Sequence, residues 1–207
     1  MRYYPIFVDL QGKPAVVVGG GHIAERKVRT LLECGACVTL IAPEGTPGIA
    51  DLADRGTICW RRRAYQDGDL DGAFCTYAAT NDNPVNVAVY NEAERRRQLC
   101  NVVDVPPLCN FIVPSIVNRG DLLVAVSTAG NSPALAKRLR ADLETEIGPE
   151  YQALNDLLGR LRPEVKRRYP EEAPRNDVLD RMLSAGVLDL LREGRAGEAE
   201  ELAWKCL

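Results

Sequence analysis

The chain lacks any long hydrophobic run and has little histidine, tryptophan or methionine. Its 207 residues include one histidine, two tryptophans and two methionines. No stretch approaches the roughly 18 apolar residues that a transmembrane helix needs. The N-terminal sequence MRYYPIFVDLQGKP has neither the apolar core nor the small-residue cleavage site of a signal peptide. We therefore expect a cytoplasmic protein that makes no use of a membrane.

An excess of charge of one sign is also missing. Lysine and arginine number 26 against 29 acidic residues, which gives a formal net charge of −3. No global positive field is present to recruit nucleic acid, so any anion must be bound by a local cluster of cations. Because His22 is the single histidine, a metal site built on paired histidines is excluded, and we predict no metal ligand.

The seven cysteines form no pattern typical of disulfides or of a zinc site. Their number is odd and they are widely spread, so we expect reduced thiols. Cys34 and Cys37 have C-x-x-C spacing, but no second pair completes a zinc site. A redox pair should open a helix, whereas this pair follows one, with Gly35 as the residue after its end. We interpret both as small, semi-buried residues.

Apolar runs alternate with helix-like segments in the first half of the chain. The β-branched run PAVVV over residues 14–18 predicts a strand buried on both faces of a sheet. In the segment 81–98, Asn83 is the predicted N-cap of a helix and Pro84 its first residue. Further strands are predicted at residues 37–43, 57–60, 74–80 and 99–105. The alternation predicts an α/β domain with a Rossmann-like, doubly wound parallel sheet over residues 1–113.

The pattern changes after residue 113. Residues 114–148 read as a strand, a turn and a long helix that begins with Ser132 as N-cap and Pro133 as first residue. One face of this helix is apolar, through Leu135, Leu139, Leu143 and Ile147. A lone strand with one helix cannot close a core. Pairing with a second subunit is therefore favoured over extension of the first sheet.

Residues 149–207 read as a small helical domain. Apolar residues recur at helical spacing, and Pro163, Pro170 and Pro174 are predicted to separate its helices. The chain thus divides into a dinucleotide-binding domain over residues 1–113, an α+β segment over 114–148 and a helical domain over 149–207.

A glycine-rich loop between the first strand and the first helix predicts nucleotide binding. Gly19, Gly21 and Ala24 fit the pattern G-x-G-x-x-G/A. The glycines permit a tight turn and close approach to a pyrophosphate, and the small residue lets the helix pack on the strand. A purely structural glycine turn is the alternative. His22 is expected to lie beside the cofactor as a helix-start residue, not to transfer protons.

The loop after the second strand bears on the choice of dinucleotide. Glu44 lies near the position at which an acidic residue binds the ribose hydroxyls. The alternative is a solvated loop glutamate. Because no arginine occupies this loop to receive a 2′-phosphate, NAD is favoured over NADP.

Several longer blocks carry a more specific signal than the glycine loop. They are VVVGGGHIAERK, AATNDNPVN, NVVD, FIVPS and VSTAGNSPALAKRLR, in this order along the chain. Their wording and order resemble the precorrin-2 dehydrogenase family, which includes the N-terminal module of fused siroheme synthases. The resemblance covers roughly residues 3–147.

The resemblance implies oxidation of precorrin-2 to sirohydrochlorin in siroheme biosynthesis, with NAD+ as hydride acceptor. Some members of the family are also ferrochelatases, for which Fe2+ or Co2+ is a substrate. An intertwined homodimer, formed through residues 114–148, is implied as well. The cofactor-binding residues that we expect are Gly19, Gly21, His22, Ile23, Ala24, Pro43, Glu44 and Thr80.

The substrate is an acidic tetrapyrrole, and its oxidation releases a hydride and a proton. Asp104 lies at the end of the fifth predicted strand, matches the aspartate that the family needs and is the predicted catalytic base. An Asx-turn residue before Pro106 is the alternative. The substrate carboxylates are expected to be held by Ser127, Thr128, Asn131, Ser132, Lys137 and Arg138. A solvated helix face is the alternative for the two cations.

Two rival functions remain at this point. One is a redox-sensing regulator that binds NAD without catalysis and uses the helical domain to contact a partner. Its mixed charges, as in EVKRR and EAEEL, do not form a basic recognition helix. The other is a chelatase with a vestigial nucleotide site, against which the intact Gly19 and Gly21 argue.

Overall fold

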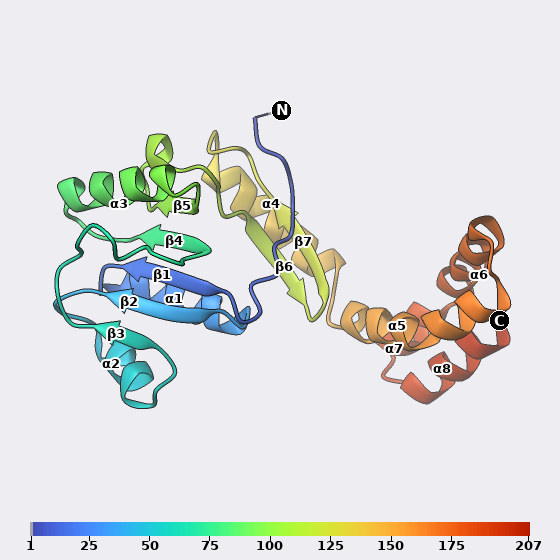
Figure 1. The fold of residues 1–207 in the computed structure, drawn as a ribbon. Helices are drawn as coiled ribbons and strands as arrows, with labels where there is room; N and C mark the ends of the chain where they lie inside the picture. Colours follow the sequence, from blue (N-terminus) through green and yellow to red (C-terminus); the bar gives the residue numbers. More distant parts are fainter. Residues whose placement is uncertain (1) are drawn as a thin grey trace. The chain divides into compact units, whose positions relative to one another are not determined.

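The computed structural model describes residues 2–207, which form two compact units that meet in sequence at Val113 and Pro114. The first unit alternates strands and helices (Figure 1). Its elements are β1 (Pro14–Val18), α1 (His22–Glu33), β2 (Cys37–Ile41), α2 (Pro47–Asp54), β3 (Cys59–Arg61), β4 (Cys75–Ala78), α3 (Asn83–Arg95), β5 (Leu99–Val102) and the 3-10 helix η1 (Pro106–Leu108).

The sheet of the first unit has the order β3-β2-β1-β4-β5, and all of its strand pairs are parallel. The predicted Rossmann-like architecture is confirmed. The apolar side chains of β1 alternate between two cores. Val17 packs with Val28 of α1 and Ile49 of α2, whereas Val16 packs with Val89 of α3 on the other face. Parallel strands place their carboxyl ends at one edge, where such folds bind ligands.

Several local predictions in this unit need correction. The second, fourth and fifth strands end earlier than predicted, at Ile41, Ala78 and Val102, so that Asp104 follows β5 and does not belong to it. The N-cap of α3 is Asp82 and not Asn83, because the Asp82 side chain accepts a hydrogen bond of 3.2 Å from the Val85 amide. The third strand comprises Cys59–Arg61 and starts later than predicted. The helix end at Gly35 is confirmed. Its φ of 74° is favourable for glycine alone, and its amide donates to the Leu32 carbonyl.

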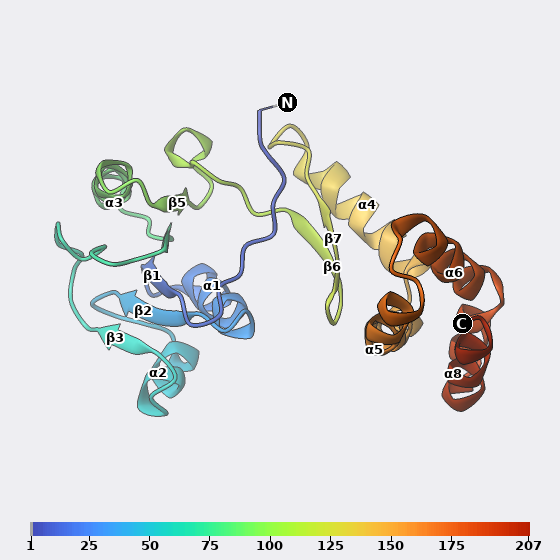
Figure 2. The same ribbon diagram turned by 45° about the vertical axis from the view of Figure 1, so that its right-hand side comes forward.

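The second unit begins with a β-hairpin and continues with helices. Its elements are β6 (Ser115–Arg119), β7 (Leu122–Val126), α4 (Pro133–Glu146), α5 (Glu150–Arg168), α6 (Glu172–Ser184), α7 (Val187–Arg192) and α8 (Ala196–Lys205). The predicted lone strand is therefore wrong, because β6 pairs with β7 in antiparallel register. The hairpin lies against α4 (Figures 1 and 2), and Ser132 caps α4 as predicted.

The helices α5 to α8 share one core, which includes Leu157, Leu161, Met182 and Ala203. Pro163 and Pro174 do not separate helices, contrary to the prediction. Pro163 lies inside α5 and Pro174 in the first turn of α6. A proline inside a helix costs about 3 kcal/mol, and burial of Leu161 and Val165 on either side of Pro163 opposes that cost. Within residues 2–207, no helix is long and apolar enough to span a membrane.

Candidate functional site

The glycine-rich loop between β1 and α1 is shaped by close backbone contacts. Gly19 has a φ of +118°, and a Cβ atom there would lie 2.3 Å from the Ala79 carbonyl oxygen. At Gly20 a Cβ atom would lie 1.8 Å from the Glu44 carbonyl oxygen, whereas at Gly21 it would meet nothing within 4 Å. Packing within the protein thus requires the first two glycines. Gly21 instead leaves open space in front of α1.

The N-terminus of α1 offers free hydrogen-bond donors to this space. The Glu25 amide makes the first bond of the helix, to the Gly21 carbonyl at 3.0 Å, and no side chain caps the helix. The amides of His22, Ile23 and Ala24 therefore lack intrahelical partners. A helix N-terminus of this kind fits a diphosphate, because its amides and its dipole both favour negative charge.

A cleft of about 930 Å³ lies at this edge of the sheet, between the loops that follow β1, β2 and β4. Most of the predicted cofactor residues line it, namely Gly19, Gly21, His22, Ile23, Pro43, Glu44 and Thr80. Ala24 is fully buried beneath α1, where it packs against the sheet. Among residues 2–207, those that line the cleft include no lysine or arginine.

Two hydrogen-bonded clusters hold the walls of the cleft. The Glu25 carboxylate of α1 accepts a bond of 2.6 Å from the Thr46 hydroxyl, which itself caps α2 at the Ile49 amide. The bond from Thr46, with a second from Arg29, lowers the pKa of Glu25. On the opposite wall, the Thr80 hydroxyl accepts a bond of 3.1 Å from the Asp82 amide at the start of α3. These bonds fix the loops that surround the glycine turn.

Sequence reasoning missed Gly20 and Tyr65, both of which line the cleft. The Tyr65 hydroxyl donates to the Glu92 carboxylate, and burial raises the pKa of this tyrosine. Glu92 is 1% exposed and also accepts from the Gly68 amide at 3.0 Å. The loop that contains Tyr65 and Gly68 is thus anchored to α3. The sequence signal for this contact is Glu92, an acidic residue next to Ala93 on the face of the predicted helix that is buried.

Asp104 does not line the cleft but lies at the same edge of the sheet, two residues after β5. It is exposed, and its φ of 60° is in the left-handed region. The Val105 amide closes the turn by donating to the Val102 carbonyl at 3.2 Å. Aspartate and asparagine enter this region more readily than other non-glycine residues, so an aspartate suits this turn.

The predicted substrate-binding residues all belong to the second unit. The Thr128 hydroxyl bonds with the Ser132 backbone, and the Ser127 hydroxyl accepts from the Ala129 amide at 3.1 Å. The Ser132 hydroxyl caps α4. These hydroxyls therefore shape the turn before the helix. Asn131 and Lys137 are exposed, and Arg138 forms an ion pair of 2.9 Å with Asp142.

Another cation near α4 has a structural role. Arg119 donates to the carbonyl oxygens of Ile147 and Glu144, at 2.8 and 3.0 Å, and thereby satisfies the C-terminal end of α4. Its guanidinium is committed to these carbonyls.

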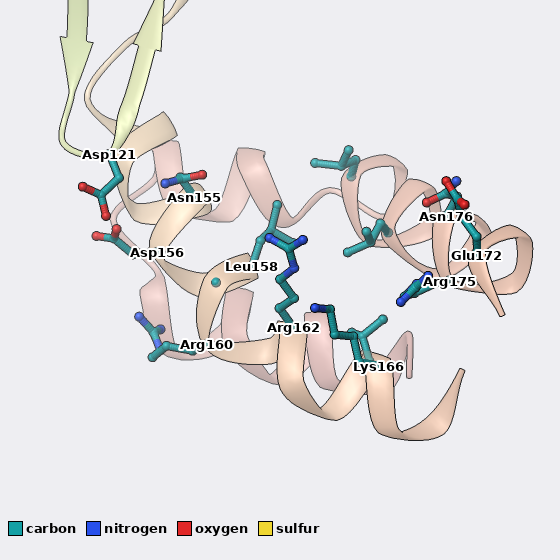
Figure 3. A pocket seen from close by; sticks show the side chains of 14 residues that line it. Asp121, Asn155, Asp156, Leu158, Arg160, Arg162, Lys166, Glu172, Arg175 and Asn176 are labelled. Carbon is teal, nitrogen blue, oxygen red and sulfur yellow. The ribbon is translucent and has the colours of Figure 1, made fainter. Parts of the chain in front are cut away.

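A groove of about 1140 Å³ lies between α5 and α6 within the second unit. Figure 3 shows Arg162 and Lys166 of α5 and Arg175 of α6 around this space. Within residues 2–207 no carboxylate lies within ion-pair distance of these three cations, whereas Arg160 pairs with Glu200 at 3.4 Å. Leu158, Leu179 and Leu183 add apolar side chains to this mainly polar lining. In the same described range, no group of three or more histidine, cysteine or acidic side chains converges to hold a metal ion.

Comparison with protein families gives three consecutive matches. Residues 6–115 match a model described as putative NAD(P)-binding. Residues 119–146 match the central region of a sirohaem biosynthesis protein, and residues 150–205 match the sirohaem synthase dimerisation region.

Comparison with individual proteins points the same way. The chain is 43% identical to a siroheme synthase of Methylococcus capsulatus, over 98% of this chain and 43% of that protein. It is 39% identical to siroheme synthase 1 of Serratia proteamaculans, over 97% of this chain and 42% of the relative. The chain therefore spans less than half the length of these curated relatives.

A solved structure extends the comparison to three dimensions. It is named SirC, precorrin-2 dehydrogenase, and it matches with a TM-score of 0.77 and 28% sequence identity. The match covers 98% of this chain and 100% of that one, so it includes both units of the fold.

Proposed function

We propose that this chain, which belongs to the family of putative NAD(P)-binding proteins matched over residues 6–115, oxidises precorrin-2 to sirohydrochlorin. One observation carries the proposal. The uncapped start of α1 and the open side of Gly21 fit a diphosphate, and Asp104 lies at the same sheet edge. The similarity to a precorrin-2 dehydrogenase and to siroheme synthases supports this choice of substrate.

The reaction removes two electrons and two hydrogens from a reduced tetrapyrrole. The loop at Gly21 and the first amides of α1 would hold a nicotinamide cofactor, which would supply the hydride acceptor for one hydrogen, and the second hydrogen would leave as a proton. Asp104 is the base that takes this proton, because its carboxylate is exposed at the edge of the sheet where the cofactor site lies. Asp104 lies in a tight turn two residues after β5, where its backbone is left-handed.

The cofactor is proposed to be NAD+. NADP+ carries an additional phosphate on the adenosine ribose, which proteins bind with arginine or lysine. Glu44 lies in the cleft, at the loop after β2 where the ribose is expected, and among the described residues the lining holds no such cation. A carboxylate there repels the extra phosphate. Titration with NAD+ and NADP+ tests this preference, and equal affinities would refute it.

We propose that the functional oligomeric state of the protein is a homodimer. Ile116 of β6, Leu123 of β7 and Leu135 and Leu139 of α4 are at least 39% exposed, although all are large and apolar. Exposed apolar side chains grouped on one segment are typical of a subunit interface. The matched dimerisation region covers residues 150–205, so it supports a dimer but does not include these four side chains.

The direct test is to incubate the purified protein with precorrin-2 and NAD+ in the absence of metal. Sirohydrochlorin and NADH should appear in equal amounts, followed by absorbance. A regulator without catalysis would bind NAD+ and yield neither product. Adding Fe2+ or Co2+ to preformed sirohydrochlorin without NAD+ tests metal insertion separately.

A further inference from the structure

Lys27 occupies an unusual position for a lysine. It belongs to the second turn of α1 and is half-buried instead of extending into solvent. Its ammonium lies 5.4 Å from the centre of the Tyr77 ring, within cation–π range. Tyr77 is itself fixed by an edge-to-face contact with Phe111, with ring centres 5.5 Å apart. The lysine is thus held over β4 by a rigid aromatic pair.

This position brings Lys27 toward the turn that carries Asp104. Tyr77 pairs in register with Asn101 of β5, and Asp104 follows three residues later. The pKa of Lys27 is lowered, mainly by burial and further by Arg26, while the negative charge of Asp104 opposes the shift. The two charges therefore influence each other. They form no direct ion pair, because among residues 2–207 no carboxylate lies within 4.0 Å of the Lys27 ammonium.

The half-buried Lys27 ammonium over Tyr77 has no carboxylate partner among residues 2–207 and is therefore available to an anionic ligand. A half-buried charge binds a counter-ion more strongly than an exposed one, because water screens it less. The proposed substrate carries several carboxylates. One of them can be placed by Lys27 while Asp104, on the neighbouring turn, faces the reacting carbon.

We propose that Lys27 is a substrate-binding residue, which pairs with a carboxylate side chain of the tetrapyrrole and sets its orientation relative to Asp104. This inference rests on the proposed oxidation of precorrin-2. It adds a residue of the dinucleotide-binding unit to substrate recognition, for which the sequence indicated only residues after Gly120.

The test compares Lys27→Met with Arg26→Met. Methionine keeps the apolar stem over Tyr77 and removes the charge, and Arg26 is the exposed neighbouring cation on the same helix. Lys27→Met should raise the KM for precorrin-2 by about 10- to 100-fold, the range expected for a lost charge-assisted hydrogen bond. The Kd of NAD+ and the melting temperature should not change. Lys27→Arg should restore most of the affinity, and Arg26→Met should resemble the wild type.

Substrate with esterified carboxylates provides a second reading, because the wild type and Lys27→Met should then have the same KM. An unchanged KM in Lys27→Met, or an equal loss in Arg26→Met, would overturn the inference. So would loss of NAD+ binding or of stability in Lys27→Met, which would make the role structural. If the wild type does not oxidise precorrin-2, the proposed function fails by itself. The binding of sirohydrochlorin, measured by absorbance, then still tests the inference, because Lys27→Met should bind it more weakly than Arg26→Met.

Discussion

At the scale of single residues, the three glycines of the loop after β1 have different tasks. Gly20→Ala places a methyl group against the Glu44 carbonyl, with a starting distance of 1.8 Å. Overpacking of this kind should lower the free energy of unfolding by about 1–3 kcal/mol. Gly21→Ala meets no protein atom within 4 Å, so its stability should match the wild type while its affinity for NAD+ falls.

Chemical denaturation and NAD+ titration of both variants measure these effects. We expect Gly20→Ala to lower the free energy of unfolding and Gly21→Ala to lower only the affinity for NAD+. A stable Gly20→Ala variant, or a Gly21→Ala variant with undiminished affinity, would contradict the assignment of these glycines.

Asp104 permits an equally conservative substitution. Asparagine has nearly the same shape and tolerates the left-handed φ of 60° at this position, but it cannot accept a proton from the substrate. Asp104→Asn should therefore lower kcat by about 10²- to 10⁴-fold, the usual contribution of a general base. The Kd of NAD+ should be the same as in the wild type. Stopped-flow measurement of NADH formation checks this, and turnover near that of the wild type would remove Asp104 from its role.

The pattern Gly19, Gly21 and Ala24 could be identified from sequence because each requirement is local to one turn. The requirement for glycine at position 20 could not be predicted, because the atom that excludes a side chain there is the carbonyl oxygen of Glu44, on another loop. Tyr65 could not be identified for the same reason, because the carboxylate that accepts its hydrogen bond belongs to Glu92, which is distant in the sequence. Residues that depend on contacts across the fold leave little trace in the local sequence.

At the scale of elements, α4 presents an apolar face that its own unit leaves uncovered. Leu139 is 42% exposed there. Leu139→Asp would bury a charge in the proposed interface, which is costly without a partner. We expect a monomer in sedimentation velocity at concentrations where the wild type is a dimer. Glu146→Gln, at the exposed end of the same helix, serves as control, and a dimeric Leu139→Asp variant would argue against this interface.

The strands and helices of the Rossmann-like sheet were predictable because their apolar runs are bounded by clear turn residues. The hairpin was not, because β6 carries the polar Asn118 and Arg119 and leaves Ile116 39% exposed. The division of the helices at Pro163 failed for another reason. Local propensity favours a break there, but the buried neighbours Leu161 and Val165 hold α5 together.

At the scale of the whole molecule, stability in acid should depend on Asp69. This carboxylate is 8% exposed and pairs with Arg63 at 2.6 Å and with Arg61 at 2.9 Å. The hydrogen bond from Arg63 is the main cause that lowers the pKa of Asp69 to about 2. Because the pKa is lower in the folded state, the stabilisation is present above the ordinary pKa of about 3.9. It is lost as the pH falls toward about 2.

Asp69→Asn should therefore be less stable at neutral pH and should lose less stability between pH values of about 4 and about 2. Denaturation curves at several pH values, followed by tryptophan fluorescence in a Trp204→Phe background so that Trp60 alone reports, measure the difference. The exposed Asp54 provides the control Asp54→Asn. A pH dependence in Asp69→Asn equal to that of the wild type would show that the pair does not stabilise the fold.

The central claim for the molecule is that one chain joins a dinucleotide site to an aspartate that acts as a base and deprotonates a tetrapyrrole. The most direct test is a single-turnover reaction with precorrin-2 and NAD+, in which the wild type and Asp104→Asn are compared at saturating NAD+. We expect equimolar sirohydrochlorin and NADH from the wild type, and bound NAD+ without product from the variant. Absence of product from the wild type, or full product from the variant, would contradict it.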